Sequence, residues 1–257
     1  MDGVRWHRCD LLDGRQSDAV VDEVRPTHLL HFAWYATPPD YWTSPDNVAW
    51  VEASLHLLRR FAELGGERAV LAGTCAEYDL AHGYCSEQLT PLRPATLYGA
   101  SKHALQTVTA RADLSTAWGR IFFLYGPAEH PSRLVASVIR ALMQGQVAPC
   151  SHGRQVRDFL HAQDVASAFV ALLDSEVEGP VNVASGVPVT IGTVASTIGA
   201  LMDRPDLVRL GAREAAADEP PLVLADVRRL EEELGWTPRF SLESGLGETI
   251  SWWREHG

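Results

Sequence analysis

The sequence predicts an α/β protein in which helices cover a parallel sheet. Over the first two thirds of the chain, short apolar runs that are typical of buried strands alternate with stretches of helical periodicity. This strand–helix–strand order produces parallel pairing. Beyond residue 184 the composition changes, because Gly186 and the prolines at 188, 205, 220, 221 and 238 interrupt the periodic stretches. The second part of the chain is therefore expected to form a smaller, loop-rich lobe.

The expected elements follow in order along the chain. Strands are predicted at residues 28–34, 68–73, 117–124 and 181–184, with a further one near 207–210. Helices are predicted at about 47–64, 98–112, 162–174, 191–203, 226–234 and 242–255. No internal repeat or low-complexity linker separates them.

Composition excludes several classes of protein. Acidic residues outnumber basic ones by 33 to 22 over 257 residues, which disfavours nucleic acid as a partner. No apolar run approaches the ~20 residues of a membrane span, and the N-terminus lacks a secretory apolar region, so a cytoplasmic protein with no membrane partner is expected. The four cysteines, at positions 9, 75, 85 and 150, form no Cys-x-x-Cys pair. Neither a metal site nor a disulfide framework is therefore expected.

One lysine stands out among the basic residues. Lys102 is the only lysine in the chain, whereas the other 21 basic residues are arginines. It follows Tyr98 in a Tyr-x-x-x-Lys spacing, which on a helix places both side chains on one face. A cation beside a phenol lowers the pKa of the phenol and suits it to proton transfer near neutral pH. The alternative is a chance pattern on a surface helix.

Polar and aromatic residues follow two of the predicted strands. Thr74 comes directly after strand 68–73, at the end where open α/β sheets bind ligands. Its hydroxyl is therefore a candidate for binding a substrate oxygen beside Tyr98, although threonine is also a common turn residue. After strand 28–34, an aromatic group is predicted either to line a ligand site or simply to pack, and consists of Trp34, Tyr35, Tyr41 and Trp42.

In combination these features resemble the extended short-chain dehydrogenase/reductase family, also called the NAD-dependent epimerase/dehydratase family, from about Val4 to Trp253. The motifs that carry the resemblance are Thr74 four residues before Tyr78, Tyr98-x-x-x-Lys102, residues 120–127 (RIFFLYGP), 153–159 (GRQVRDF) and 234–238 (LGWTP). Within the family, residues 31–38 and 73–79 are similar to reductases of nucleotide-linked 4-keto-6-deoxy sugars.

The resemblance implies a fold class, which is α/β with a truncated Rossmann-type parallel sheet and a smaller C-terminal substrate-binding lobe. Residues 1–126, with 155–184 returning to them, would form the Rossmann-like domain. Residues 127–154 and 185–257 would form the lobe. The resemblance also implies a homodimer.

The resemblance further implies site roles. Thr74, Tyr98 and Lys102 would be catalytic: Thr74 would orient a carbonyl, Tyr98 would exchange its proton, and Lys102 would lower the pKa of Tyr98. The cofactor would be NAD(P), and the residues expected to contact it are Asp10, Leu11, His31, Ala33, Tyr98 and Lys102. The residues expected to contact a nucleotide-sugar substrate are Thr74, Cys75, Tyr35, Trp42 and Arg157.

Two positions refine these roles. Arg157 matches the family position that clamps the nucleotide diphosphate, a task that suits a bidentate guanidinium; the alternative is a surface salt bridge with Asp158. Arg213 is a second candidate for balancing phosphate charge. Related 4,6-dehydratases carry an Asp-Glu pair where this chain has Cys75 and Ala76, so dehydration is disfavoured. No histidine is placed by the sequence to activate Cys75 as a nucleophile.

The sequence also departs from the family at its N-terminal side. The Gly-x-x-Gly-x-x-Gly turn that holds the cofactor pyrophosphate does not occur. Strand 28–34 would then expose unpaired backbone groups, so residues 4–8 are predicted to form a strand beside it, joined through a helix at about 15–24. Alternatively, another chain covers this edge. Beside the NAD(P)-dependent reductase or epimerase, two functions stay open: a cofactor-independent acid–base enzyme for elimination, isomerisation or cyclisation, and a non-catalytic partner subunit.

Overall fold

A four-stranded parallel sheet forms the centre of the larger part of the molecule. The structure is a computed structural model that describes residues 3–216 and 219–257. The sheet has the order β1-β2-β4-β8, and its strands are β1 (His28–His31), β2 (Arg68–Thr74), β4 (Ser115–Ile121) and β8 (Gly179–Val183). Every neighbouring pair is parallel. The predicted α/β class and parallel sheet are confirmed.

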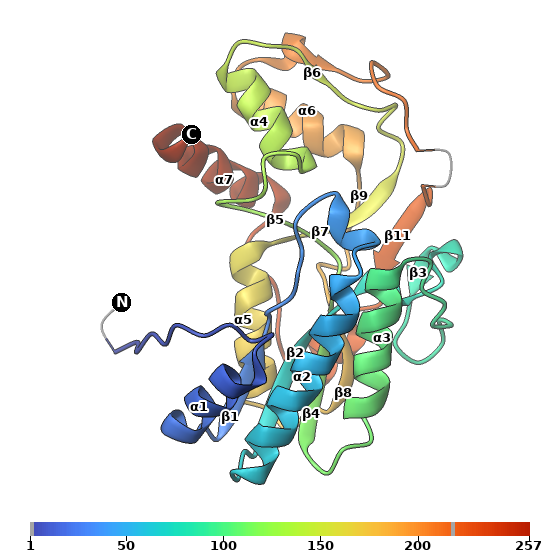
Figure 1. Cartoon of the computed structure of the whole chain (residues 1–257). Coiled ribbons are helices and arrows are strands. Elements are labelled where there is room, and N and C mark those ends of the chain that lie inside the picture. Colours follow the sequence, from blue (N-terminus) through green and yellow to red (C-terminus); the bar gives the residue numbers. More distant parts are fainter. Residues whose placement is uncertain (1–2, 217–218) are drawn as a thin grey trace.

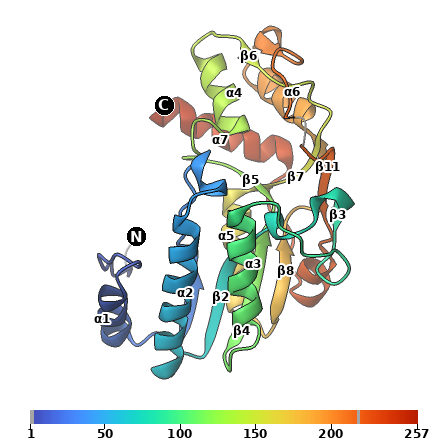
Figure 2. The same cartoon turned by 45° about the vertical axis from the view of Figure 1, so that its right-hand side comes forward.

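Helices cover both faces of this sheet (Figures 1 and 2). On one face, Ala69 and Leu71 of β2 pack against α2 (Asp46–Glu63) and α3 (Leu97–Thr109). On the other face, Val70 and Ala72 pack against α5 (Ala162–Leu173). Alternate residues of one strand thus serve two separate cores, as the period of two requires. None of the described helices combines the length and the apolar character that a membrane crossing needs.

A second sheet and a helical core lie outside the first sheet. The sheet comprises β3 (Tyr84–Cys85), β11 (Leu222–Ala225), β7 (Val156–His161) and β5 (Phe123–Tyr125), with β9 (Pro188–Thr190) antiparallel to β7. A short parallel pair joins β6 (Ala148–Pro149) to β10 (Val208–Arg209). The helices α4 (Leu134–Met143), α6 (Ile191–Leu201) and α7 (Leu242–His256) enclose one apolar cluster. Figure 1 shows these three helices beyond the carboxyl end of the first sheet.

Most differences from the predicted elements concern α4, the second sheet and η5. The sequence analysis did not predict α4 or the second sheet, whose strands of two to six residues are too short to show a clear period. The strand predicted at 117–124 is two strands, β4 and β5, which belong to different sheets. The helix predicted at 226–234 is a short π-helical turn, η5 (Arg229–Glu233). The remaining predicted helices lie within about three residues of their predicted bounds.

The prediction for residues 4–8 is wrong. These residues form no strand, and in the described part of the chain β1 pairs only with β2. Arg5 and His7 instead face Glu23 of α1 (Gly14–Val24), and Trp6 is 81% exposed. The segment lies outside the sheet, on its β1 side (Figure 1). The helix predicted at 15–24 does form, and α1 packs beside α2 through ion pairs such as Arg60–Asp22.

Candidate active site

Thr74 ends β2 and begins the short 3₁₀ helix η2 (Cys75–Glu77). Its hydroxyl accepts a hydrogen bond from the backbone N–H of Ala76 at 3.2 Å, and the Glu77 carboxylate accepts one from the backbone N–H of Thr74 at 2.8 Å. This reciprocal arrangement is a capping box. It fixes the Thr74 side chain at the carboxyl end of the sheet, which is the predicted position.

Tyr98 is brought to Thr74 by the start of α3. Thr96 caps this helix by accepting from the backbone N–H of Gly99 at 3.2 Å. A Cβ atom on Gly99 would lie 2.3 Å from the carbonyl oxygen of Ala76, so only glycine allows α3 to approach η2 this closely. Burial raises the pKa of Tyr98, and a hydrogen bond with the Thr74 side chain opposes this rise. Without a ligand, Tyr98 is a protonated phenol.

Lys102 lies one turn after Tyr98 and is 4% exposed. Its Nζ donates a hydrogen bond to the carbonyl oxygen of Ala72 at 2.8 Å and lies 3.8 Å from the centroid of the Trp34 ring. Burial lowers the pKa of Lys102 to about 7, and the Glu77 carboxylate partly offsets this fall. In this structure the burial of the Tyr98 phenol, and not the charge of the Lys102 ammonium, has the largest effect on the pKa of Tyr98. The expected lowering of that pKa by Lys102 therefore stays a prediction.

A buried charged network lies behind Thr74. The Glu77 side chain is fully buried and accepts from Arg120 Nε at 2.8 Å and from Trp118 Nε1 at 2.9 Å. Arg120 also donates to the Tyr78 hydroxyl at 3.0 Å. The sequence analysis did not single out Glu77 or Arg120. The available signal was an arginine within the apolar run 117–124, because a charge in a buried strand requires a partner.

Aromatic rings from the segment after β1 pack on Tyr98. The rings of Tyr41 and Trp42 meet the Tyr98 ring edge-on, with centroids 5.0 and 5.7 Å apart. Tyr41 is buried, and the Arg133 guanidinium lies 5.7 Å from its ring centroid. Tyr35 is half-buried, and no ring pairing joins it to this group in the described part of the chain. Trp42 thus lies beside the phenol as the substrate assignment requires, whereas Tyr35 has no such contact.

The four other residues assigned to the cofactor occupy two regions. His31 is buried at the end of β1 with its Nε2 2.8 Å from the Ser54 hydroxyl, and burial lowers its pKa to about 4. Ala33 follows it and is half-buried. Asp10 is exposed before α1, where its carboxylate accepts from the backbone N–H of Leu12 at 3.0 Å, and Leu11 is half-buried.

NAD(P) fits these residues only in part. The buried Tyr98–Lys102 pair suits the nicotinamide end of the cofactor. The described residues include no glycine-rich turn that would hold the pyrophosphate, and β1 has no strand on its outer side among them.

Arg157 is 2% exposed on β7 and holds a carboxylate. Its NH2 group donates to Glu219 Oε1 at 2.7 Å, and Gln155 Nε2 donates to Glu219 Oε2 at 2.9 Å. Asp158 is not its partner, because the Asp158 carboxylate accepts instead from the backbone N–H groups of Ser185 and Gly186. The alternative interpretation of Arg157 as half of a surface salt bridge with Asp158 is therefore wrong.

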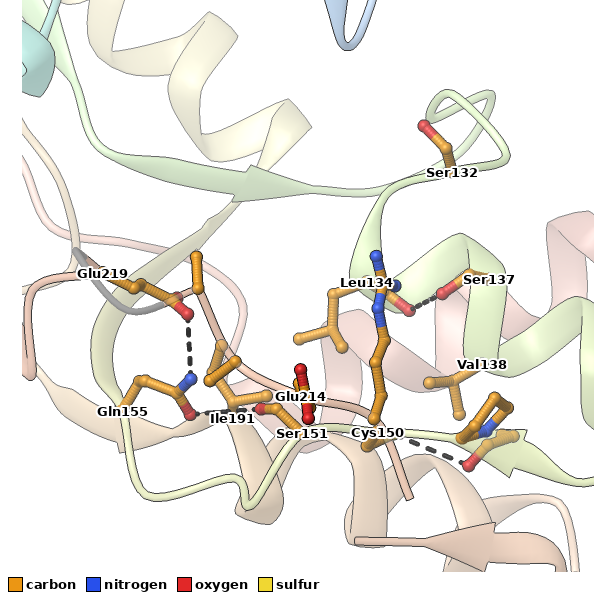
Figure 3. Close-up of a pocket in the computed structure, with 15 residues that line it drawn as sticks. Ser132, Leu134, Ser137, Val138, Cys150, Ser151, Gln155, Ile191, Glu214 and Glu219 are labelled. Carbon is orange, nitrogen blue, oxygen red and sulfur yellow. Dashed lines mark hydrogen bonds between the residues drawn. The ribbon is translucent and has the colours of Figure 1, made fainter. Parts of the chain in front are cut away.

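A cavity of about 410 Å³ adjoins this carboxylate (Figure 3). Its volume lies within the range of about 300–1,000 Å³ for small-molecule sites. Figure 3 shows Gln155 between Glu219 and Ser151, with Leu134 and Val138 of α4 on the other side of the cavity. Arg213 also lines it. Its lining combines apolar side chains with polar ones such as Ser151, Gln155 and Glu214.

Cys75 follows Thr74 in η2 and is buried. Both Arg157 and Tyr98 interact electrostatically with its thiol. Burial raises the pKa of Cys75 to about 12, so the thiol stays protonated and is a poor nucleophile. In the described part of the chain, no group of three His, Cys, Asp or Glu side chains is arranged to hold a metal ion.

Several curated proteins have sequences similar to this chain. The curated UDP-glucuronic acid decarboxylase 1 of Xenopus tropicalis is 28% identical over 253 residues, which are 91% of this chain and 59% of that protein. The UDP-glucuronate 4-epimerase of Thermodesulfobacterium geofontis is 25% identical over 214 residues, 80% of this chain and 65% of that one. This chain therefore spans about three fifths of the length of the decarboxylase.

The fold has relatives among solved structures. The UDP-glucose 4-epimerase of Thermus thermophilus, in complex with NAD, superposes with a TM-score of 0.87 at 24% identity and covers 100% of this chain and 87% of its own. The sequence model of the NAD-dependent epimerase/dehydratase family matches residues 1–184, well over half of the chain. The chain therefore belongs to the NAD-dependent epimerase/dehydratase family.

Proposed function

We propose that this chain binds a nucleotide-linked 4-keto-6-deoxy sugar and transfers a proton at its carbonyl oxygen, in an NAD(P)-dependent reductase or epimerase reaction. The observation that carries the proposal is the order of groups from the cavity to the phenol. Gln155 borders the cavity, Arg157 follows two residues later on β7 and interacts electrostatically with Cys75, and Cys75 interacts in the same way with Tyr98. A nucleoside would occupy the cavity, a diphosphate would reach the guanidinium, and the sugar would meet the phenol.

A second arginine borders the same path. Ser132 lines the cavity, and its neighbour Arg133 packs over Tyr41, which in turn contacts Tyr98. The diphosphate would therefore lie between two guanidinium groups, Arg133 and Arg157. Two local cations compensate for the net negative charge of the chain, which by itself disfavours an anionic ligand.

The chemistry follows from the protonation states of the groups. Tyr98, held as a neutral phenol by burial, can donate its proton to a ketone oxygen that the Thr74 hydroxyl orients. The ammonium of Lys102 then stabilises the resulting phenolate. The reduced cofactor, NAD(P)H, would supply the hydride to the carbonyl carbon. Dehydration would need carboxylates after Thr74, where the chain has Cys75 and Ala76 instead.

Two titrations test the proposal. Calorimetry with UDP, dTDP and GDP should detect binding of at least one nucleoside diphosphate, and NADPH and NADH fluorescence should change when the protein is added. Binding of a nucleoside diphosphate without either nicotinamide would favour the cofactor-independent acid–base enzyme. No binding of any nucleoside diphosphate would reject the proposal. Light scattering of the same sample tests the expected homodimer.

A further inference from the structure

The last residues of β2 are held between two oppositely charged side chains. The carbonyl oxygen of Ala72 accepts from Lys102 Nζ at 2.8 Å, and the backbone N–H of Thr74 donates to Glu77 Oε1 at 2.8 Å. Between them, a Cβ atom on Gly73 would lie 2.8 Å from Glu77 Oε1 and 2.1 Å from Trp118 Nε1. The carboxylate therefore lies directly against the backbone of the residue that separates the two hydrogen bonds.

The position of Glu77 is fixed from several directions. Its carboxylate is fully buried and is held by Arg120, Trp118 and the backbone N–H of Thr74. A buried carboxylate needs an ion-pair partner and hydrogen bonds, and Glu77 has both. The carboxylate therefore lies at a fixed position beside the end of β2.

Few other charged groups face Lys102. His31 interacts with it from β1, and Tyr98 precedes it by one turn on α3. With a pKa of about 4, His31 is neutral at pH 7, and burial keeps the Tyr98 phenol neutral as well. Trp34 covers the ammonium with an uncharged ring. Among the described residues, Glu77 is the acidic side chain that interacts electrostatically with Lys102.

We propose that Glu77 is a positioning residue of the candidate site: its carboxylate fixes the Thr74 backbone and, across Gly73, supplies a counter-charge that favours the ammonium form of Lys102. Its meaning for catalysis rests on the proposed function, because a protonated Lys102 matters only if Tyr98 passes through a phenolate. The electrostatic link between Glu77 and Lys102 does not depend on any substrate.

The single lysine makes this link directly measurable. Protein labelled with ¹³C-lysine has one side-chain signal in an NMR spectrum, and that signal belongs to Lys102. Its chemical shift titrates with the ammonium. In the wild-type protein the midpoint should fall near pH 7, and in Glu77→Gln it should fall by about one pH unit, since removing a nearby opposite charge disfavours the charged form.

A second variant and a control distinguish the loss of the Glu77 charge from a loss of folded structure. Glu77→Gln leaves Arg120 without its carboxylate, so the double variant Glu77→Gln/Arg120→Gln removes both charges of the buried pair and should show a smaller fall, because loss of the Arg120 cation favours the Lys102 ammonium. Asp164→Asn removes another buried carboxylate, which accepts from the backbone of residues 239 and 240, and should leave the midpoint unchanged. An unchanged Lys102 midpoint in a folded Glu77 variant overturns the proposal. So does failure of both Glu77 variants to fold, because Glu77 would then be a structural residue.

Turnover of a nucleotide sugar gives a second measurement, which is independent of the NMR titration of Lys102. If the wild-type protein turns over a nucleotide sugar, Glu77→Gln should shift the limb of the kcat–pH profile that reports Lys102 to lower pH by the same amount, with KM little changed. If no turnover is found, the proposed function fails while the NMR result still decides the link between Glu77 and Lys102.

Discussion

Lys102 and Arg157 are buried cations of the candidate site, and the structure holds them differently. Lys102 donates to a backbone carbonyl, and burial lowers its pKa to about 7. Arg157 donates directly to the Glu219 carboxylate; burial also lowers its pKa, but a guanidinium stays charged at any physiological pH. The comparison teaches that the site combines a cation whose charge can change during a reaction with one whose charge is permanent.

The largest expected effect concerns the phenol beside Lys102. Tyr98→Phe removes one hydroxyl and should lower kcat by about 10²–10⁴-fold, the usual contribution of a positioned acid. The unfolding temperature should stay close to that of the wild type, because the ring contacts with Tyr41 and Trp42 remain. Activity near the wild-type level would exclude Tyr98 as the proton donor.

Exchanging one kind of cation for the other tests the comparison itself. Lys102→Arg should lower kcat by roughly 10²-fold, because a larger group with a permanent charge must fit under the Trp34 ring. Arg111→Lys, an exposed conservative change just after α3, is the control and should have no effect. If Lys102→Arg keeps both full activity and the wild-type pH profile, an ammonium whose charge can change is not needed at this position.

The permanent cation should matter for binding. Arg157→Ala should weaken nucleoside diphosphate binding by tenfold or more, since hydrogen bonds to charged groups contribute about 1.5–3 kcal/mol. Arg154→Ala, which removes an exposed arginine three residues earlier, is the matched control for calorimetry. Equal dissociation constants for wild type and Arg157→Ala would leave Arg157 with a structural role only.

Burial, which lowers the pKa of Lys102, also lowers the pKa of His31. Its folded-state pKa of about 4 is below the unfolded value of about 6.5, so the unfolded state binds more protons between these values. Stability should therefore fall as the pH drops through this window, by about 1 kcal/mol between pH 7 and 5.5. Urea unfolding of wild type and His31→Gln at both pH values measures this. If the variant loses as much stability on acidification as the wild type, His31 is not the cause.

The smallest effect is expected at the partner of Arg157. Glu219 holds the guanidinium that the diphosphate would need, so Glu219→Gln should tighten nucleoside diphosphate binding about two- to fivefold, the range of a partly exposed ion pair. Weaker binding in this variant would mean that Glu219 supports the ligand rather than competing with it.

Short-range sequence patterns predicted the positions of residues whose placement depends on their neighbours in the chain. The Tyr98-x-x-x-Lys102 spacing placed both residues on α3, and the position of Thr74 after an apolar run placed it at the end of β2. The structure brings all three together, while their catalytic roles stay predictions. The strand proposed at residues 4–8 was wrong because Arg5 and His7 find a partner in Glu23 of α1, and strand pairing offers them none.

By itself, the sequence determined the α/β class, the helices with clear periodicity and the candidate Thr74–Tyr98–Lys102 group, because these depend on periods and spacings of a few residues. Tertiary structure decided the rest. Glu77 meets Arg120 from 43 positions away, and Arg157 meets Glu219 from 62. Such pairs leave no periodic signal, since the chain between them folds through other elements first. Burial, which lowers the pKa of Lys102 and raises that of Tyr98, likewise exists only once helices, strands and lobe have packed together.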